Sequence, residues 1–376
     1  MKLLFTPGPL TTSARVKEAM LRDLGSRDDE FLGIVRGIRR DLLKLCGPGF
    51  DGYEVVPMQG SGTFAIEAVI SSAVPPDGTL LVLVNGAYGR RIVRIAEVHR
   101  IRCRQLEFPE HAPVDPEAVR AELRRELPTH VAVVHCETTT GILNPVEEIG
   151  AVVRESGCTY VVDAMSSFGG IPLDVAAAQI DFLVSSSNKC VEGVPGFAFA
   201  IARREAIERC LGRARTLSLD LYEQWAGLER DGQFRFTPPT HVLLAFRRAL
   251  GELAEEGGIE GRAARYRANA GALLSGMGEL GFEAYLAEEH RSWIITTFRY
   301  PRNPAFVFEQ FYTQLAERGF VIYPGKLTHE DCFRIGTIGR IKTDDVHELV
   351  ETIRKVLSQM NVSLTRPAHE LLPGVE

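Results

Sequence analysis

The stretch IDFLVSSSNKC, residues 180–190, contains the most informative residue of the chain. An apolar run over residues 180–184 predicts a core strand, and three serines, Asn188 and Lys189 follow it directly. Most lysines are solvated on loops, which is the alternative interpretation. Here the apolar segment 194–200 follows closely, and desolvation between two packed segments would lower the pKa of the amine toward its neutral, nucleophilic form. Lys189 is therefore a candidate for Schiff-base chemistry with an aldehyde.

Short apolar runs like this one recur along the chain and alternate with predicted helices. Such runs are typical of strands covered on both faces, so the sequence predicts an α/β fold with a mostly parallel sheet. The other predicted strands are residues 79–85, 129–137, 159–165 and 196–204, and the helices between them are residues 61–74, 88–99 and 146–156.

Polar residues stand where these elements meet. Ligands of parallel sheets bind beyond the carboxyl ends of the strands, so we expect these residues to converge on one side. They are Ser61-Gly62-Thr63, the segments 85–88 and 137–139, Asp163 and the segment 185–189.

The pattern of predicted elements changes at EEGGIEG, residues 255–261. A long amphipathic helix, strand-like segments at 292–300 and 332–339, and a helix at 344–358 predict a smaller α+β domain. We predict an N-terminal arm at residues 1–17, a large domain at 18–258 and a small C-terminal domain at 259–376. Within the first part, TSARVKEAMLRDLG (12–25) predicts a helix that ends at Gly25.

The composition excludes several classes of function. The net charge is −6, so no basic field favours nucleic acid or an anionic membrane. No apolar run approaches the roughly 20 residues of a membrane helix, and the N-terminal stretch is a poor signal peptide. The seven cysteines form no C-x-x-C pair, which indicates reduced thiols in a cytoplasmic protein and neither a disulfide framework nor a metal site.

Asp163 lies near the end of the predicted strand 159–165 and precedes Lys189 in the chain. A lone aspartate at this place is more often a helix cap or a turn residue. Beside a Schiff-base lysine, however, an aspartate can pair with the pyridinium nitrogen of pyridoxal phosphate and keep it protonated. The pair therefore predicts pyridoxal phosphate as the cofactor.

Ser61, Gly62 and Thr63 open a predicted helix. Backbone N–H groups at a helix N-terminus, with hydroxyls and a glycine, form an anion site, although a simple N-cap is the alternative. The segment GSGTFA (60–65) also fits a dinucleotide-binding motif. Against this alternative, Pro57 interrupts the preceding run, and no acidic residue closes a second strand about 20 residues further on.

Four further polar or aromatic residues have two interpretations each. Tyr88 is either a core residue or a stacking partner for a flat cofactor ring. Thr138 is either a turn residue or a hydrogen-bond donor to such a ring. His135 is interpreted as a buried strand histidine, and a catalytic base is the alternative. Arg334, in the apolar segment FRIG, forms either a structural salt bridge or a site for a substrate carboxylate or phosphonate.

Taken in order, the motifs S-G-T, N-G-A-Y-G, H-x-E-T-T-T-G, D-A-M-S-S-F-G-G, S-S-N-K-C and F-R-I-G resemble those of the class V (fold type I) pyridoxal-phosphate-dependent aminotransferases. The resemblance extends from about residue 3 to residue 360 and includes GSRDDEF and NKCVEGVPGFAF. It implies a large domain with a mostly parallel seven-stranded sheet between helices, and a smaller C-terminal α+β domain. Alanine–glyoxylate and serine–pyruvate aminotransferases typically have Trp at the position of Tyr88 and S-G-H at the S-G-T.

The resemblance also implies roles for the matching residues. Lys189 would bind pyridoxal phosphate covalently, Asp163 would pair with the ring nitrogen, and Tyr88 would stack on the ring. Thr138 would hydrogen-bond the 3-oxygen of the ring. The phosphate would be held by Ser61, Gly62 and Thr63, with Asn188 close by.

Two implied roles extend beyond one cofactor site. Thr237, in RFTPPTH, would reach the phosphate of a neighbouring subunit, which implies a homodimer. Arg334 would hold the phosphonate of 2-aminoethylphosphonate and the carboxylate of pyruvate, while Arg27 and Ser26 would line the substrate mouth. The implied activity is amino transfer between these two substrates. Alternatives are another class V transaminase acting on serine, alanine or glyoxylate, a Schiff-base aldolase without cofactor, and a non-catalytic nucleotide-binding module.

Overall fold

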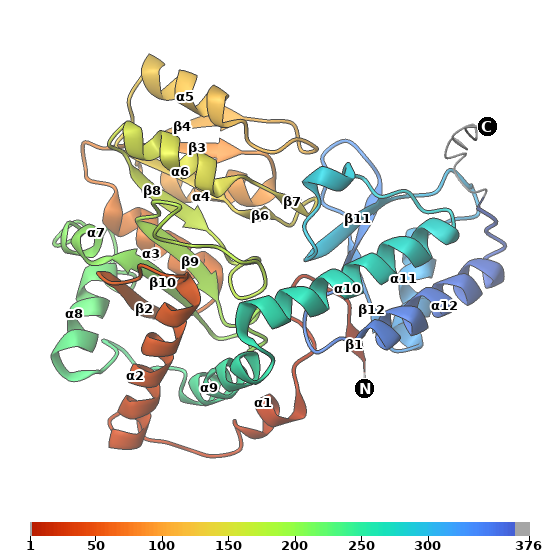
Figure 1. Ribbon diagram of the computed structural model, residues 1–376, viewed down its shortest axis with the longest axis horizontal. Coiled ribbons are helices and arrows are strands. Elements are labelled where there is room, and N and C mark those ends of the chain that lie inside the picture. Colours follow the sequence, from red (N-terminus) through yellow and green to blue (C-terminus); the bar gives the residue numbers. More distant parts are fainter. Residues whose placement is uncertain (1, 365–376) are drawn as a thin grey trace.

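The computed structural model describes residues 2–364, which form a large domain around one sheet and a small domain beside it (Figure 1). The sheet has seven strands in the order β2-β10-β9-β8-β5-β3-β4. Only β10 is antiparallel to its neighbours, which confirms the predicted α/β fold. The strands are β2 (Tyr53–Gln59), β3 (Thr79–Val84), β4 (Arg102–Glu107), β5 (His130–Val134), β8 (Thr159–Asp163), β9 (Phe182–Ser186) and β10 (Phe197–Arg203).

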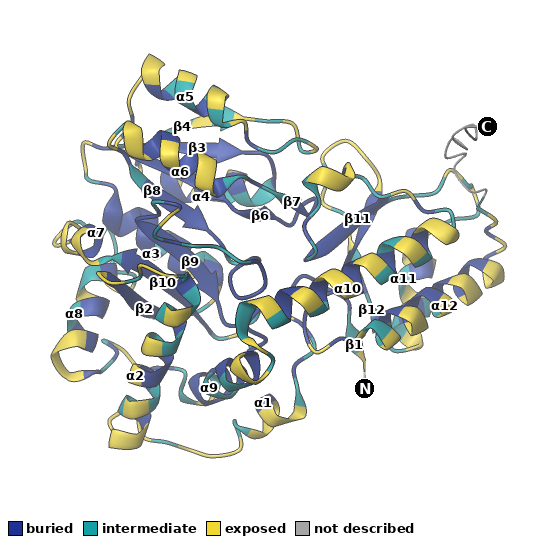
Figure 2. Ribbon diagram, viewed as in Figure 1, coloured by how far each residue is buried: buried dark blue, intermediate teal, exposed yellow. Residues whose placement is uncertain are grey.

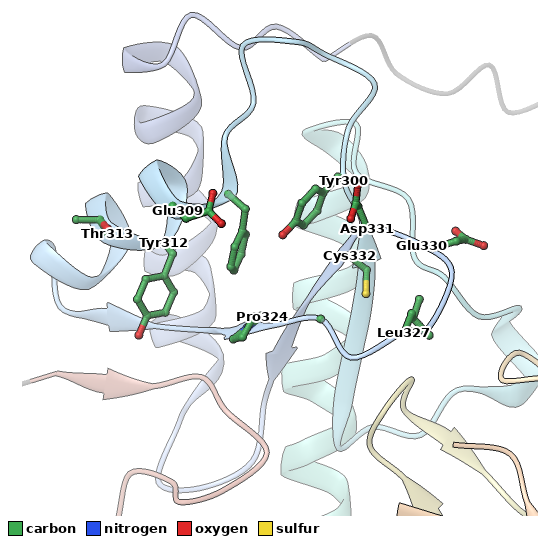
Figure 3. Close-up of a pocket in the computed structure, with 11 residues that line it drawn as sticks. Tyr300, Glu309, Tyr312, Thr313, Pro324, Leu327, Glu330, Asp331 and Cys332 are labelled. Atoms are coloured by element: carbon green, nitrogen blue, oxygen red, sulfur yellow. The ribbon is translucent and has the colours of Figure 1, made fainter. Parts of the chain in front are cut away.

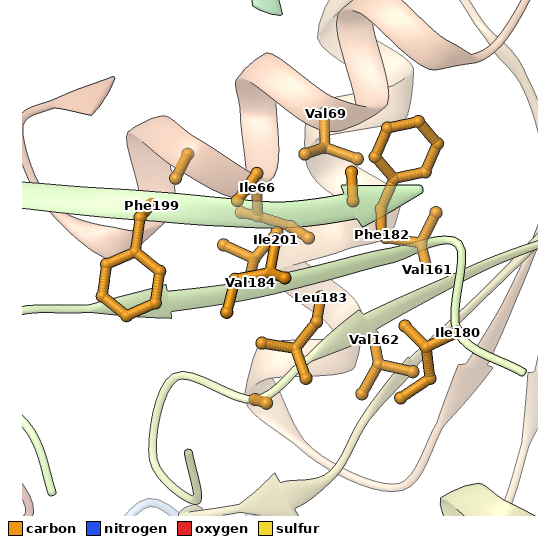
Figure 4. Packing of buried hydrophobic residues seen from close by; sticks show 14 of the residues in the cluster. Ile66, Val69, Val161, Val162, Ile180, Phe182, Leu183, Val184, Phe199 and Ile201 are labelled. Carbon is orange, nitrogen blue, oxygen red and sulfur yellow. The ribbon is translucent and has the colours of Figure 1, made fainter. Parts of the chain in front are cut away.

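Helices cover the sheet and bury both of its faces. In Figure 4, Ile66 and Val69 of α3 pack on the side of the sheet that Val184 faces, whereas Leu183 points to the opposite side. Adjacent residues of a strand alternate between faces, so apolar packing on both sides requires the continuous apolar runs. The helices of the large domain are α1 (Ala14–Glu18), α2 (Asp29–Leu43), α3 (Gly62–Ala73), α4 (Ala87–Val98), α5 (Pro116–Arg125), α6 (Val146–Glu155), α7 (Arg204–Glu208), α8 (Leu221–Asp231) and α9 (Thr240–Glu255), with a 3-10 turn η1 (Lys44–Cys46).

The sequence did not predict the two edge strands. β2 contains Pro57, which was interpreted as an interruption, but an edge strand tolerates proline because one side of its backbone needs no ladder hydrogen bond. β4 is charged and partly exposed, a composition that protects an edge from pairing with other chains. Since β2 pairs only with the antiparallel β10, the segment from β2 into α3 lacks the parallel arrangement of a dinucleotide-binding unit.

The first predicted helix is shorter than expected. α1 ends at Glu18, whereas the sequence predicted a helix that continues to Gly25. Val16 is the buried residue of α1, and Leu21 beyond it is exposed. Beyond Glu18, Met20 and Leu24 still pack against the large core as partly buried residues, but they do so from a turn and an irregular segment.

The small domain contains a three-stranded antiparallel sheet in the order β11-β14-β13. A second hydrophobic core joins Phe5 to residues between Leu273 and Val362, and β1 (Leu3–Leu4) pairs with β12 of this domain. The remaining elements are β6 (Cys136–Glu137), β7 (Ile142–Leu143), α10 (Gly258–Glu279), η2 (Glu288–His290), β11 (Ile295–Arg299), α11 (Phe308–Glu317), β12 (Phe320–Val321), β13 (Tyr323–Pro324), β14 (Cys332–Gly336) and α12 (Thr343–Gln359).

Burial follows this arrangement. Figure 2 shows the central strands buried, while helices such as α5, α10 and α12 expose one side. None of the helices within residues 2–364 is long and apolar enough to cross a membrane.

Candidate active site

A cavity of about 270 Å³ lies where the carboxyl ends of β5, β8 and β9 meet the first turns of α3 and α4. It brings together residues that are far apart in the sequence, as expected for the ligand side of a parallel sheet. Those singled out from the sequence are Ser61, Gly62, Thr63, Tyr88, Asp163, Asn188 and Lys189. The other lining residues are Arg91, Val134, Cys136, Met165, Ser166 and Ser186.

Lys189 stands on the loop that follows β9, and its amine points to the N-terminal arm. Its Nζ donates a hydrogen bond to the carbonyl oxygen of Pro7 at 2.6 Å. Burial lowers the pKa of Lys189, although the nearby acidic groups Tyr88 and Asp163 oppose this shift. A lysine in this environment is biased toward the neutral amine, which is the form that attacks a carbonyl group.

Asp163 closes β8 and faces the same cavity. Burial raises the pKa of its carboxyl group to about 6, even though the backbone N–H of Met165 donates to Oδ1 at 2.9 Å. This hydrogen bond is the turn contact that the alternative interpretation expected. The side chain also lines the cavity, however, where a buried carboxylate favours a cationic partner such as a pyridinium nitrogen.

The N-terminus of α3 is open toward the cavity. Ser61 occupies the N-cap position, but its side chain makes no capping hydrogen bond. The hydroxyl and the first backbone N–H groups of α3 therefore remain available to an anion. A Cβ atom added at Gly62 would lie 2.2 Å from Sδ of Met165, so a larger residue here would require the Met165 side chain to move.

Arg91 is a cavity residue that the sequence analysis missed. Its Nη1 donates to Oγ1 of Thr63 at 3.2 Å, and its guanidinium carbon lies 4.8 Å from the ring centre of Tyr88. The available signal was spacing, because residues three apart on a helix share a face, and Arg91 follows Tyr88 by three positions on α4. Its position beside Thr63 fits a phosphate group.

The hydroxyl of Tyr88 lies near several cationic side chains. Burial alone would raise the pKa of this phenol, but a hydrogen bond with Thr138 and nearby positive charges outweigh burial and lower it. The charges belong to Lys189, Lys326 and Arg334. Nζ of Lys326 lies 3.4 Å from the phenol oxygen. The sequence analysis missed Lys326 because no predicted strand or motif residue adjoins it.

Arg334 lies on β14 and is 2% exposed. Its Nε donates to the carbonyl oxygen of Pro324 at 3.0 Å, and its Nη1 donates to that of Thr138 at 2.7 Å. Burial lowers the pKa of Arg334, and within residues 2–364 no carboxylate pairs with it, so the structural salt bridge is not found. An oriented, buried guanidinium without a counter-charge is suited to bind the oxyanion of a substrate.

Thr138 and Arg334 adjoin Tyr88 but are not among the residues that line this cavity, and three further residues from the sequence analysis lie outside it. Thr237 is exposed, and its carbonyl oxygen accepts from Nε2 of Gln59 at 3.3 Å. Arg27 is exposed and Ser26 is partly buried, on the segment before α2. A single chain therefore does not bring these residues to the cavity.

His135 lies in the short segment between β5 and β6 and is buried. Burial lowers its pKa to about 4, so the imidazole is neutral near pH 7. It is not among the cavity residues, which agrees with its interpretation as a structural histidine.

These residues fit pyridoxal phosphate. The cavity offers an amine of lowered pKa for the aldehyde and a buried carboxylate for the ring nitrogen. It also offers an aromatic ring for stacking and an uncapped helix N-terminus with an arginine beside it for the phosphate. Each group matches one part of the cofactor, and the separate elements that carry them all end at this cavity.

Comparisons with known proteins point to one family. The model of the family "Aminotransferase class-V" matches residues 13–330. The 2-aminoethylphosphonate–pyruvate transaminase of Syntrophobacter fumaroxidans is 52% identical over 357 residues, which cover 94% of this chain and 96% of that protein. The protein of the same name from Salmonella schwarzengrund is 51% identical over 359 residues, with 94% and 97% covered.

Two solved structures show the same architecture. Ureidoglycine–glyoxylate aminotransferase from Bacillus subtilis superposes with a TM-score of 0.89 at 25% identity, and the match covers 97% of this chain and 95% of that one. Alanine–glyoxylate aminotransferase from Nostoc sp. gives a TM-score of 0.86 at 27% identity, with 95% of each chain covered.

Proposed function

Since this chain belongs to the class V aminotransferase family and is a pyridoxal-phosphate-dependent aminotransferase, we propose that it transfers the amino group of 2-aminoethylphosphonate to pyruvate. The products would be phosphonoacetaldehyde and L-alanine. The two relatives of this name described above are 51–52% identical to the chain, whereas the alanine–glyoxylate aminotransferase is 27% identical. This difference supports the phosphonate substrate over the alternative transaminases.

Pyridoxal phosphate, when bound, supplies an electron sink for the charge that develops on the substrate carbon next to nitrogen. Lys189 holds and moves the proton in this reaction. As a neutral amine it takes the proton from that carbon. It then donates a proton to the carbon on the other side of the nitrogen, which belongs to the cofactor. Asp163 contributes a buried negative charge at the end of β8, which stabilises a protonated ring nitrogen.

The choice of 2-aminoethylphosphonate and pyruvate as substrates is supported by the environment of Arg334. It is buried, oriented by two backbone carbonyls and free of any carboxylate partner within the described chain. A phosphonate and a carboxylate each present two oxygens to the guanidinium fork, so one arginine can serve both half-reactions.

The test is formation of L-alanine from 2-aminoethylphosphonate and pyruvate by the purified enzyme loaded with pyridoxal phosphate. We expect Arg334→Met to lower kcat/KM for both substrates by about 10- to 100-fold, because hydrogen bonds to charged groups contribute about 1.5–3 kcal/mol. Arg334→Lys is expected to retain part of the activity, since it keeps the charge and loses the fork.

The control donors are L-serine and L-alanine with glyoxylate as acceptor. If these pairs react and 2-aminoethylphosphonate with pyruvate does not, the chain is another class V transaminase and our choice of substrates is wrong. If Arg334→Met is as active as the unmodified enzyme, Arg334 does not bind the phosphonate or the carboxylate of the substrates.

We also propose a homodimer in a cytoplasmic location. We take the exposed side chains of Phe64, Leu217 and Phe236 as one surface. Phe64 follows the cavity residue Thr63, and the Gln59 amide donates to the backbone carbonyls of Phe236 and Thr237. A second copy on this surface would cover the apolar side chains and would bring Thr237 to the neighbouring site. The seven cysteines are all free thiols, which supports a reducing compartment.

A further inference from the structure

The loop GKLTHED, residues 325–331, joins β13 to β14 and reaches from the small domain to the mouth of the cavity. Lys326 is its point of contact with Tyr88. The Nζ atom lies 3.4 Å from the phenol oxygen and 4.9 Å from the ring centre. These contacts hold the ammonium group of an exposed side chain at the place where Arg334 also approaches the phenol.

A second contact fixes the loop to the large domain. The backbone N–H of Thr328 donates to Oε2 of Glu110 at 3.2 Å, and its hydroxyl donates to Oε1 at 3.0 Å. Arg90 of α4 pairs with the same carboxylate at 2.5 Å. Burial would raise the pKa of Glu110, but the hydrogen bonds from Arg90 and Thr328 outweigh it and lower the pKa. The carboxylate thus stays ionised near pH 7 and holds the loop across the two domains.

Neighbouring side chains of the loop contact different parts of the molecule. Lys326 and Thr328 contact the large domain, whereas Leu327 between them lines a cavity of about 400 Å³ inside the small domain. Figure 3 shows this second cavity, with Tyr300 and Tyr312 on its other walls. Lys326 and Thr328 are two residues apart on the same loop, so the contact of Thr328 with Glu110 also limits where the Lys326 side chain can lie.

The charge of Lys326 has no acidic partner within residues 2–364, since none of the ion pairs there includes it. Once Lys189 holds the cofactor, Arg334 and Lys326 are the two cationic side chains that remain at the Tyr88 hydroxyl. This arrangement offers two positive charges from two directions to one oxyanion.

The two substrates differ in how they can use these charges. A carboxylate has one negative charge and two oxygens, both of which the fork of Arg334 can bind. A phosphonate has three oxygens and, like other phosphoryl groups near neutral pH, a charge between about −1 and −2. Its third oxygen and additional charge have no equivalent in pyruvate. An ammonium group is a compact point charge with three donors, which suits this oxygen.

We propose, on the basis of the proposed function, that Lys326 is a specificity residue that recognises the third oxygen and the second charge of the phosphonate. Arg334 serves both substrates, whereas Lys326 serves the aminophosphonate alone. Thr328 and Glu110 act as positioning residues that hold Lys326 at the mouth of the site.

The test separates the two half-reactions and uses Lys326→Met with Lys355→Met as the matched control, because Lys355 is an exposed lysine on α12. We expect Lys326→Met to lower kcat/KM for 2-aminoethylphosphonate by about 10- to 100-fold and to change that for pyruvate by less than threefold. Lys326→Arg is expected to restore most of the loss. Thr328→Val is expected to raise KM for the aminophosphonate several-fold with little change in kcat.

A binding measurement decides the proposal without turnover. Ethylphosphonate and propionate, which lack the amino group, are titrated into the loaded enzyme while the visible absorbance of the cofactor is followed. Lys326→Met should weaken the binding of ethylphosphonate about 10-fold and the binding of propionate less than twofold. If Lys326→Met weakens the binding of both ligands equally, or weakens the binding of neither, Lys326 is not a specificity residue. Absence of alanine formation in the unmodified enzyme contradicts the proposed function instead, and the titration still reports on Lys326.

Discussion

Asp163 is in a different electrostatic situation with and without the cofactor. In the protein alone, burial raises the pKa of the carboxyl group from 3.8 to about 6. The folded state therefore favours the protonated acid, and stability is lost as the pH rises from about 4 to above 6. Near pH 7 the ionised group costs roughly 3 kcal/mol, at about 1.4 kcal/mol per pH unit. A cationic ring beside it would offset this cost.

Asp163→Asn should therefore affect the protein in opposite ways in its two states. Without cofactor, we expect the free energy of unfolding at pH 7.5 to rise by about 1–3 kcal/mol and to be unchanged at pH 4, as measured by urea denaturation. With cofactor, kcat should fall at least about 100-fold because the ring nitrogen loses its counter-charge. A cofactor-free variant that is destabilised at pH 7.5 would contradict the raised pKa.

At the scale of elements, the N-terminal arm passes very close to Lys189, the proposed catalytic lysine. Residues 6–9, TPGP, run between the Lys189 loop and β14. Gly8 has φ +118°, and a Cβ atom there would lie 2.7 Å from Cδ of Lys189 and 2.9 Å from its Nζ. A Cβ atom at Gly336 of β14 would lie 2.5 Å from the backbone of Thr6. Glycines on both sides thus allow the arm to place the Pro7 carbonyl against the amine.

Gly8→Ala should displace Lys189 and lower kcat by at least about 10-fold, because small misplacements of reacting groups have large effects on rate. The control is Gly212→Ala, where φ is +70° and no atom lies within 4 Å of the added Cβ. Both variants should lose about 1–2 kcal/mol of stability from the backbone conformation. Steady-state kinetics and thermal unfolding measure the two effects. Equal kcat values in the two variants would show that the arm does not position the lysine.

The elements also show what the sequence could predict. Strands β3, β5, β8 and β9 were visible as apolar runs because both of their faces are buried, and their ends located Asp163 and Lys189. β2 and β4 lack that pattern because they lie at the edges. Arg91 and Lys326 were missed for a related reason. A charged residue on a helix or in a polar loop has the same pattern whether it faces solvent or a site, and only the packing distinguishes the two.

At the scale of the whole molecule, a buried ionic cluster joins the lysine loop to the small domain. Glu192, three residues after Lys189, accepts from Nη2 of Arg265 and from the Tyr266 hydroxyl of α10, each at 2.7 Å. Arg265 also donates to the carbonyl oxygen of Gly339, shortly after β14. The cluster therefore couples the position of the loop that carries Lys189 to the position of β14, which carries Arg334. Its partners are about 70 residues apart in the sequence, so no local pattern could have predicted them.

The proposed homodimer makes a prediction that one chain alone cannot satisfy. Thr237 is exposed, so Thr237→Glu should not disturb the fold of a single chain. If Thr237 reaches the phosphate of the partner's cofactor, the new negative charge should weaken the binding of pyridoxal phosphate at least about 10-fold. Mixed dimers of Thr237→Glu and Lys189→Ala chains should regain activity, because one of the two sites then combines an intact lysine with an intact threonine. Sedimentation checks the assembly and alanine formation checks the activity. Mixed dimers as inactive as each variant alone would place Thr237 in its own chain's site or in none.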